Sequence, residues 1–430
     1  MAQVRRSSLQ KRMRGVLRTA FGMLPPGVRF PVLRYMIDCD PAPDARLELK
    51  IAETKEELEA CFRLLHDAYV GSGFMKPHPS GMRITQYHAL PTTTTLCAKY
   101  EGRVVGTMSM IREGVFGFPL QAIFDLDPLR SEGGKIAEIS ALAVHPDFRK
   151  TGGWILFPLM KFMYQYCTKY FDTRHLVIAV NPDKIQLYEA LLFFRRMQQK
   201  TIEGYDFANG APAVVASLDL RQAPHIFREA YKGRSLRKNL YKYFVELKLP
   251  NIRLPQRRYH TTNDPVMTPE LLDYFFNQQS DLFASLEDRK KSLLWSIYTM
   301  AEYRPVLPLL ELDPVGPVHV RQHQRFSLRC PGVVTFPTPS GPRPYILNVI
   351  EVSLSGFQAE CKLDLEVGQE GEALIELGEN EKTTLKVSAV RKMESEGGVF
   401  VGFKLAEPDR VWRECVAALE VGHTSYDLMI

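Results

Sequence analysis

The alternation of apolar and polar residues predicts a central strand that leads into a buried helix. The strand occupies residues 136–144, where the apolar run is long enough to be buried on both faces. Its apolar positions are Ile136, Ile139, Leu142 and Val144. The run ends in the turn HPDFRKTGG at 145–153, and a helical pattern follows from Trp154 to about residue 171. A strand, a glycine-containing basic turn and a helix are therefore expected in this order.

Shorter apolar patterns on both sides predict the rest of an α/β domain at residues 45–221. A first strand at 45–53 precedes a helix at 54–69, whose start has the capping-box pair Thr54 and Glu57. The other strand candidates are a hairpin at 96–114, a strand at 175–180 and two strands at 196–207 and 211–220. The intervening loop, residues 71–95, has no regular pattern, and loops of this length are usually functional or mobile. We expect it to overlie a binding site of this domain.

Two further patterns follow the α/β domain. Residues 222–316 are mostly helical by pattern, and one helix is expected to start at Thr268 with Pro269 in its first turn. Residues 317–422 show short alternating strands separated by turns, which predicts a small all-β barrel closed by a helix at 409–422. The expected fold is thus an α/β domain, a helical extension and a small all-β barrel.

Composition excludes several classes of protein. No apolar run of the 430-residue chain approaches the ~20 residues of a membrane-spanning helix. The seven cysteines are widely spaced and include no C-x-x-C pair, so neither a structural zinc site nor a disulfide framework is expected. No metal site is predicted. These features fit a reducing cytoplasm.

The positive net charge of +6 is concentrated at the N-terminus, where residues 1–24 hold six Lys and Arg residues and no acid. This distribution argues against general nucleic-acid binding. The spacing of apolar and basic positions in residues 1–30 predicts an amphipathic helix with a basic face, which Pro25 and Pro26 end. Residues 31–46 are expected to form a linker. The helix would lie on the inner face of the cytoplasmic membrane, dock an acidic carrier protein, or pack on the protein's own body.

The turn after the central strand has the properties of a phosphate-binding site. Gly152 and Gly153 let backbone N–H groups approach an anion, while Arg149 and Lys150 add positive charge at a helix N-terminus. The stretch LAVHPDFRKTGG resembles the cofactor loop of GNAT-type acyltransferases, which binds the phosphates of coenzyme A or of a phosphopantetheine. Trp154 stands where that family has Gly or Ala, which leaves both acyl donors open.

A second motif, NPDKIQLYEALLFF at 181–194, resembles the segment that follows the fifth strand of GNAT enzymes. Asn181, Tyr188, Glu189 and Phe193 match it, and Leu192 replaces a glycine. By this resemblance Tyr188 protonates the departing thiolate. The alternative is a tyrosine packed on the core with its hydroxyl satisfied. The strand before the motif, 175–180, is expected to splay from its neighbour and open the cofactor cleft.

The central strand supplies the candidate base, Glu138, with Ser140 on the same face. A carboxylate beside a thioester can deprotonate an attacking amine, directly or through a water. A structurally paired carboxylate is the alternative. Within the GNAT-like proteins, residues 45–220 resemble the FeeM-type N-acyl amino acid synthases and the related acyl-homoserine lactone synthases. Ala141 and Ser109 stand where lactone synthases tend to have arginine, which favours the first group.

The barrel contains two separated motifs. Arg321 and Arg325 form R-x-x-x-R, and Glu351, Ser353 and Gly356 follow in EVSLSG. Their order and spacing resemble the PilZ domain, which binds cyclic di-GMP. Guanidinium groups at this spacing can grip phosphates and stack on purines. Glu351 replaces the usual Asp or Asn, and a barrel that binds only protein is the alternative.

Together these resemblances predict a cytoplasmic N-acyltransferase that moves a long acyl chain from acyl carrier protein, or coenzyme A, to an amino acid. Cyclic di-GMP would be its effector through the PilZ domain. Three alternatives remain: a catalytically lapsed, nucleotide-responsive membrane or protein adaptor, an acyl-homoserine lactone synthase, and an acetyl-coenzyme A-dependent N-acetyltransferase.

Overall fold

The protein is described from a computed structural model. It describes residues 24–149, 151–198, 201–205, 207, 210–261, 267–298, 301–310, 323, 325–361, 367–395 and 398–420. Three sequence predictions therefore fall outside the described residues: Lys150, Arg321 and the N-terminal helix up to residue 23.

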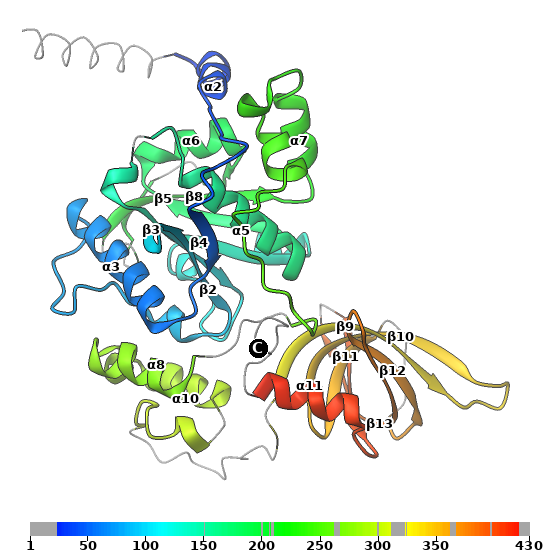
Figure 1. Ribbon diagram of the computed structural model, residues 1–430. Helices are drawn as coiled ribbons and strands as arrows, with labels where there is room; N and C mark the ends of the chain where they lie inside the picture. The colour runs from blue at the N-terminus through cyan, green and yellow to red at the C-terminus, as the bar shows by residue number, and fades with distance from the viewer. Residues whose placement is uncertain are drawn as a thin grey trace, which may run out of the picture.

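The first domain is built on one sheet in the order β1-β2-β3-β4-β5-β8-β6, with β7 paired to β8 (Figure 1). The strands are β1 (Leu47–Ile51), β2 (Thr93–Tyr100), β3 (Arg103–Arg112), β4 (Lys135–Val144), β5 (Thr173–Val180), β6 (Arg195–Arg196), β7 (Ile202–Tyr205) and β8 (Ala211–Asp219). The helices are α3 (Lys55–Gly71), α4 (Asp127–Ser131), α5 (Leu156–Tyr170) and α6 (Pro182–Leu192). The predicted α/β order is confirmed, including the central strand and the helix after it.

Each face of the sheet is covered by its own apolar core. On one face α5 packs against alternate residues of the strands, such as Leu96, Met108 and Ile178. On the other face α3 packs against the neighbouring residues, such as Cys97 and Val177. This two-sided burial explains why the strands read as continuous apolar runs in the sequence.

The capping-box prediction at α3 is half right. The Thr54 hydroxyl accepts a hydrogen bond from the Glu57 N–H at 3.2 Å, as expected. The Glu57 carboxylate instead accepts from the Glu53 N–H and from the ammonium groups of Lys50 and Lys99. Burial alone would raise the pKa of Glu57, but these hydrogen bonds outweigh it and lower the pKa to about 2. The helix start is thereby tied to β1 and β2.

The predicted linker at 31–46 is wrong in its first part. Helix α2 (Pro26–Tyr35) begins where a helix was expected to end, and it contains Pro31. Pro26 occupies the first helical position, where a missing N–H costs nothing. The Arg34 side chain holds α2 to the end of α6 through the Ala190 carbonyl, at 2.7 Å.

The extension after β8 is helical in two parts separated by an extended segment. Its α-helices and π-helical turns are α7 (Ala223–Ala230), a π-helical turn at Lys242–Glu246, α8 (Pro269–Asp273), a π-helical turn at Tyr274–Gln278, α9 (Leu282–Ser285) and α10 (Asp288–Ile297). Thr268 caps α8 as predicted. The single helix expected at 269–286 is instead broken after residue 278. Phe275 of this region packs edge-on against Phe62 of α3, with ring centroids 5.2 Å apart.

We call residues 249–261, between the two helical parts, the connecting segment. It pairs with β1, since the Leu49 N–H donates to the Asn251 carbonyl and the Arg253 N–H donates to the Leu49 carbonyl, both at 2.8 Å. Its other end enters the barrel, where Tyr259 is buried in the core. The prediction of a mostly helical region missed this segment.

The C-terminal domain is a closed six-stranded antiparallel barrel in the order β10-β11-β14-β13-β12-β9 (Figure 1). Its elements are β9 (Phe326–Phe336), β10 (Arg343–Ser353), β11 (Gly356–Cys361), β12 (Glu370–Gly378), β13 (Glu381–Ser395), β14 (Gly398–Leu405) and α11 (Arg410–Glu420). The barrel and its final helix are confirmed. Within the predicted barrel, the alternating pattern favours two strands at 320–330 and 332–338, but the structure has the single strand β9 at 326–336. The pattern indicated no strand at β11.

No helix within the described ranges is long and apolar enough to cross a membrane. All seven cysteines lie in described segments, where each is buried and has a free thiol.

Gly356 is required by a close approach of two strands of the barrel. A Cβ atom there would lie 2.2 Å from the Phe403 carbonyl oxygen of β14. Gly356→Ala is therefore expected to lower the free energy of unfolding by about 1–3 kcal/mol. Urea titration monitored by circular dichroism measures the change. Gly402→Ala is the control, because a Cβ atom at Gly402 meets its nearest neighbour at 3.6 Å. Equal stability of the two variants would contradict the packing argument.

Candidate active site

The site is built where two parallel strands separate. The parallel pairing of β4 with β5 runs from Lys135 and Thr173 to Glu138 and Val177, and it ends there. Beyond this point β4 stays paired with β3, while β5 stays paired with β8. The splay predicted for the strand at 175–180 is therefore confirmed. It leaves a wedge between the carboxyl ends of the two strands.

A bulge in β4 marks the same place. The register against β3 passes from Ser109 and Ser140 to Thr107 and Ala143, so β4 contains one extra residue. Ala141 takes up the extra residue with φ of 53°, a left-handed conformation that is uncommon for a residue with a side chain. The bulge bends the strand away from β5 directly after Glu138 and Ser140.

Glu138 lies at the base of the wedge with its side chain 1% exposed. Its Oε2 accepts a hydrogen bond from the Leu120 N–H at 3.0 Å. Burial raises the pKa of this carboxyl to about 8, and the Leu120 hydrogen bond opposes the shift. No cation pairs with Glu138 among the described residues, and the Leu120 N–H is the partner that the structure gives its carboxylate. Its proton equilibrium is therefore poised near neutral pH, as a general base requires.

The three predicted catalytic side chains line one cavity. Glu138, Ser140 and Tyr188 all face a space of about 450 Å³ between β4, β5, α5 and α6. Most of its other walls are apolar or aromatic side chains: Met108, Ile139, Leu142, Leu156, Phe157, Met160, Met163, Ile178, Leu187, Leu191, Leu192 and Phe194. The site is thus a mainly apolar chamber with a few polar groups.

Tyr188 and Asn181 have different roles in this geometry. Asn181 caps α6, since its side-chain oxygen accepts from the Asp183 N–H at 2.9 Å. Tyr188, two turns later, is partly buried, and this burial raises the pKa of its phenol. No described residue hydrogen-bonds to its hydroxyl. The ring of Tyr188 packs edge-on against Phe194, with ring centroids 5.9 Å apart, and the residue lines the cavity.

The predicted phosphate loop leads into α5, and its described residues, Arg149 and 151–153, do not line the cavity. Gly152 and Gly153 have φ of 72° and 89°, and a Cβ atom at Gly153 would meet the Phe157 ring at 2.6 Å. The Arg149 Nε donates to the Val144 carbonyl at 2.7 Å, which fixes the turn after β4. Trp154 stacks on Phe148 with ring centroids 5.6 Å apart. The first turn of α5, directly after this loop, forms a wall of the cavity.

The apolar cavity continues towards the segment beyond β8. A smaller space of about 50 Å³ shares Met160, Met163, Leu192 and Phe194 with it. Its far wall comes from α7 and the first π-helical turn, through Phe227 and Phe244. The buried Lys161 of α5 holds this turn in place by donating to the carbonyls of Tyr243 and Phe244, at 2.6 and 3.0 Å.

Sequence reasoning missed an aromatic group beside Glu138. Tyr69, Tyr205 and Phe207 also line the main cavity. Tyr87 lies close enough to Glu138 for the carboxylate to help raise the pKa of its phenol, after the larger effect of burial. Tyr69 lies in the last turn of α3, Tyr87 lies in the loop predicted to overlie the site, and Tyr205 ends β7. Only the unusual length of that loop hinted at these residues.

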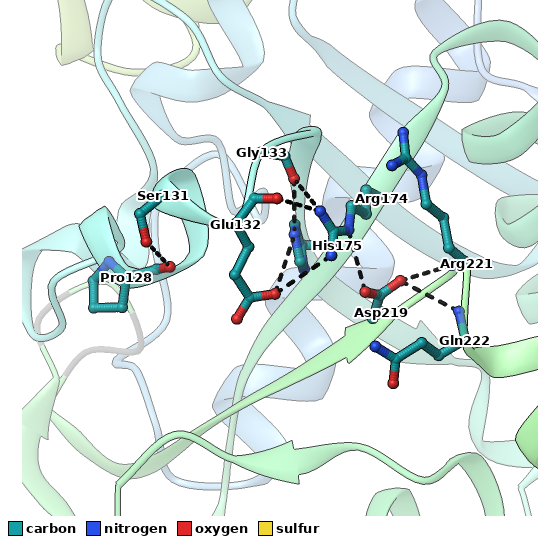
Figure 2. A network of polar contacts seen from close by, with 9 residues as sticks. All are labelled: Pro128, Ser131, Glu132, Gly133, Arg174, His175, Asp219, Arg221 and Gln222. Carbon is teal, nitrogen blue, oxygen red and sulfur yellow. Dashed lines mark hydrogen bonds and ion pairs between the residues drawn. The ribbon is translucent and has the colours of Figure 1, made fainter. Parts of the chain in front are cut away.

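One cluster has the residue types of a metal site but is already satisfied. Glu132, His175 and Asp219 lie close together, and Arg174 lies among them (Figure 2). The Arg174 guanidinium pairs with Asp219 at 3.2 Å and donates to the carbonyls of Glu132 and Gly133. The His175 Nε2 lies 3.2 Å from the Gly133 carbonyl. We interpret the cluster as a tie between β5, β8 and the loop before β4.

In the barrel, Arg325, Glu351, Ser353 and Gly356 line a second-domain cavity of about 410 Å³. Arg325 and Glu351 form an ion pair at 2.5 Å, and the Ser353 hydroxyl donates to the Gly356 carbonyl at 3.1 Å. The cationic residues Arg391 and Lys404 also line the cavity, and the sequence motifs did not include them. Arg321 lies outside the described residues.

A family model matches one part of the chain. Residues 60–219 match the family model described as FeeM, N-acyl amino acid synthase. The α/β domain is therefore of the N-acyltransferase class. No curated protein matches the chain.

Several solved structures are similar to parts of the chain. FeeM, an N-acyl amino acid synthase from uncultured soil microbes, is 22% identical, with a TM-score of 0.36 over 42% of this chain and 94% of that one. The AHL synthase LasI is 17% identical, with a TM-score of 0.34, and the match covers 45% of this chain and 98% of LasI. YcgR in complex with c-di-GMP from Escherichia coli is 14% identical, with a TM-score of 0.21, and the match covers 24% of this chain and 47% of YcgR.

The raised pKa of Glu138 has a consequence for stability. Below pH 4.5 the carboxyl is protonated in both the folded and the unfolded chain, and from 4.5 to about 8 only the unfolded chain ionises. The stability contributed by the bound proton is therefore lost as the pH rises through this window, by at most about 1.4 kcal/mol per pH unit. Glu138→Gln removes the effect, so the variant gains stability relative to the intact protein as the pH rises. Urea unfolding at several pH values measures this difference.

The exposed Glu56 of α3 provides the control. Glu56→Gln is expected to show no such rising difference. A stability difference between Glu138→Gln and the intact protein that stays constant from pH 4.5 to 8 would contradict the burial of an ionisable carboxyl at the base of the wedge.

Proposed function

We propose that the chain is an N-acyl amino acid synthase regulated by cyclic di-GMP. In this reaction a long fatty acyl group passes from a phosphopantetheine thioester, on acyl carrier protein or coenzyme A, to the α-amine of an amino acid. The observation that supports it is the convergence of Glu138, Ser140 and Tyr188 on one mainly apolar cavity at the strand splay. The family match of residues 60–219 agrees with the reaction class.

The steps follow from the positions of the groups. The neutral amine attacks the thioester carbonyl to form a C–N bond, and Glu138 takes the proton that this nitrogen must lose, so that the nitrogen keeps one hydrogen in the amide. The main-chain groups of β4 beyond Glu138 no longer pair with β5, so they are free to polarise that carbonyl. The tetrahedral intermediate then breaks its C–S bond, and the Tyr188 phenol gives its proton to the departing thiolate. The products are an N-acyl amino acid and a free thiol. Glu138 releases its proton to solvent at the end of the cycle, when the Tyr188 phenolate takes one up again.

The donor enters along the wedge. Arg149, Lys150, Gly152 and Gly153 would hold the phosphate groups of the pantetheine arm at the mouth, next to the start of α5. The acyl chain would then extend along Met160 and Met163 towards Phe227 and Phe244. An apolar space of this depth favours a long chain over an acetyl group, because burial of each CH₂ group stabilises binding by about 0.8 kcal/mol.

Cyclic di-GMP would bind in the barrel cavity next to Arg325, Ser353 and Gly356. In the structure Glu351 already neutralises Arg325, so the nucleotide phosphate must displace a carboxylate from that guanidinium. We therefore expect Glu351 to lower the affinity without abolishing binding. The basic residues Arg391 and Lys404 would contribute further charge.

The connecting segment gives the barrel a physical link to the acyl cavity. The Arg257 guanidinium donates to the Tyr166 hydroxyl at 2.6 Å and to the Thr261 carbonyl at 2.9 Å. The Tyr170 hydroxyl donates to the Pro255 carbonyl at 2.5 Å. Arg329 of β9 pairs with Asp172 directly after α5 at 3.0 Å. A shift of the barrel would therefore act on the end of the helix that lines the cavity, although coupling requires a different nucleotide affinity in two states.

Thiol release from dodecanoyl acyl carrier protein and dodecanoyl coenzyme A, measured with a mixture of amino acids, tests the chemistry. The kcat/KM of the intact protein should rise with pH through a value near 8, because Glu138 acts in its ionised form. Glu138→Gln should lose roughly 10²–10⁴-fold in activity and the pH dependence with it. Tyr188→Phe should lower kcat and leave the rising limb in place. Full activity of Glu138→Gln with an unchanged pH profile would rule out its role as the base.

Calorimetric titration with cyclic di-GMP tests the barrel. The intact protein should bind, Arg325→Ala should bind at least about 10-fold more weakly, and Glu351→Asn should bind several-fold more tightly because Arg325 is released from its ion pair. Arg321→Ala is expected to behave like Arg325→Ala. Arg343→Ala, at the start of β10 and outside the cavity lining, is the control. Binding by Arg325→Ala that equals the intact protein would exclude this cavity as the nucleotide site.

A further inference from the structure

The exposed side of α2 carries no charged side chain. Within residues 24–36, every exposed position holds an apolar residue, a proline, a glycine or the single tyrosine. The large side chains among them are Leu24, Val28, Val32, Tyr35 and Met36, and we call these five residues the α2 apolar face. Tyr35 and Met36 are 76% and 69% exposed. A helix on a protein surface normally turns its polar residues to water, so α2 has the reverse orientation.

Both charged residues of α2 are instead drawn to the protein. Arg29 is only 8% exposed. The Arg34 Nε donates to the Ala190 carbonyl at 2.7 Å, and its guanidinium lies over the Phe193 ring, 4.5 Å from the centroid. The Arg34 carbonyl accepts a hydrogen bond from the Arg234 Nη1 at 2.7 Å. These contacts fix the rotation of α2 about its axis, and the apolar face stays exposed as a result.

The α2 apolar face is continuous along the helix. Val28, Val32 and Tyr35 follow one another at spacings of four and three residues, which places them on one side of a helix. Leu24 and Met36 flank the two ends of α2. The helix lies at the edge of the first domain, away from the barrel (Figure 1). A continuous exposed apolar face of this kind marks a surface that binds an apolar partner.

The segment directly before α2 indicates which partner this is. Residues 1–23 contain no Asp or Glu, and their basic residues are Arg5, Arg6, Lys11, Arg12, Arg14 and Arg18. An apolar helix face next to a basic segment matches an anionic bilayer, whose headgroups attract cations while its acyl boundary takes up apolar side chains. Tyr35 suits the headgroup level, because its ring is apolar and its hydroxyl is polar. An acidic protein would match the basic segment, but on the α2 apolar face it would find the Tyr35 hydroxyl as the one polar side-chain group.

Helix α2 is also attached to the helix that lines the acyl cavity. Lys184 and Leu187 of α6 line this cavity and are exposed, so the cavity reaches the surface along α6. Arg34 holds α2 at Ala190, three residues after Leu187. A surface that binds α2 would therefore lie close to the cavity.

We propose that the α2 apolar face and the basic residues before it bind the surface of an anionic lipid bilayer. Helix α2 would lie in the plane of the interface, with its apolar face at the boundary between headgroups and acyl chains. This binding goes beyond the acyl transfer proposed above and does not depend on it. Together with that reaction, it would release the apolar product next to the bilayer.

Flotation of the full chain with lipid vesicles, in the absence of any acyl donor, tests the proposal. Vesicles of equal parts phosphatidylglycerol and phosphatidylcholine should bind the chain at least about 10-fold more strongly than vesicles of phosphatidylcholine alone. Raising NaCl from about 0.1 M to about 0.5 M should weaken this binding, because salt screens the attraction. Val28→Glu combined with Val32→Glu should weaken it roughly 10-fold or more, because both carboxylates would enter the interface. If the intact chain did not bind the anionic vesicles, the proposal would be overturned.

Val115→Glu combined with Val367→Glu is the matched control. It changes the net charge equally, at valines that are 43% and 59% exposed, compared with 52% and 40% for Val28 and Val32. These control positions lie in the loop after β3 and shortly before β12. The control should keep most of the binding, and equal losses in the two double variants would contradict a role of α2. Should the α2 variant fail to fold, Tyr35→Gln combined with Met36→Gln would take its place, with a smaller loss expected.

Two further measurements separate the bilayer from other partners of the α2 apolar face. Sedimentation velocity shows whether Val28→Glu with Val32→Glu converts a dimer of the chain into a monomer. A pull-down with dodecanoyl acyl carrier protein shows whether the same variant loses this protein. A variant that still binds anionic vesicles like the intact chain, but loses the dimer or the carrier protein, would overturn the proposal. Because flotation uses no substrate, failure of the acyl transfer reaction leaves its result unchanged.

Discussion

The separation of β4 from β5 after Glu138 is the constraint on which the rest of the site depends. Two parallel strands that stay paired would fill the wedge with backbone, and no cavity would exist. The bulge at Ala141 bends β4 away, while β8 continues to pair with β5 and keeps it in the sheet. The unpaired carboxyl ends then face a space that α5 and α6 cover. Glu138 is buried because it lies at the base of this wedge, and its raised pKa follows from that burial.

Segments that lie outside residues 60–219, the region matched by the family model, complete the site. The far wall of the acyl cavity comes from α7 and the π-helical turn at Lys242–Glu246, which the buried Lys161 holds against α5. A second cavity, of about 510 Å³, lies between the loop at 75–87 and residues 280–290, and it shares Phe207 with the acyl cavity. The connecting segment then passes from the edge strand β1 to the barrel core. The extension therefore supplies walls to both cavities and the contacts that join the α/β domain to the barrel.

Much of this organisation was predictable because it is encoded locally. Residues 136–144 are apolar on both faces, Thr268 and Pro269 start a helix, and the alternating pattern of the C-terminal region predicts a barrel. Glu138 and Ser140 were predicted from their places on the central strand and Tyr188 from a resemblance, and the three line one cavity because the strand and helix that hold them both border it.

The remaining features depend on contacts between distant parts of the chain. Pro26 was read as a helix end because a proline breaks a helix from within, yet it serves equally well as a first residue. Strand β9 runs through Pro331 and Gly332, which a local pattern assigns to a turn. The apolar face of α2 is not evident in the sequence, because Arg34 turns towards the protein only through its contact with α6. Likewise, no local pattern indicates that Glu351 pairs with Arg325.

The most direct test of the account is identification of the product by mass spectrometry. The full chain would be incubated with dodecanoyl acyl carrier protein or dodecanoyl coenzyme A and a mixture of the twenty common amino acids between pH 6 and 9. The account predicts N-dodecanoyl amino acid in amounts equal to the released thiol. Hydrolysis to free dodecanoate, or no release of thiol from either donor, would contradict acyl transfer to an amine at this site.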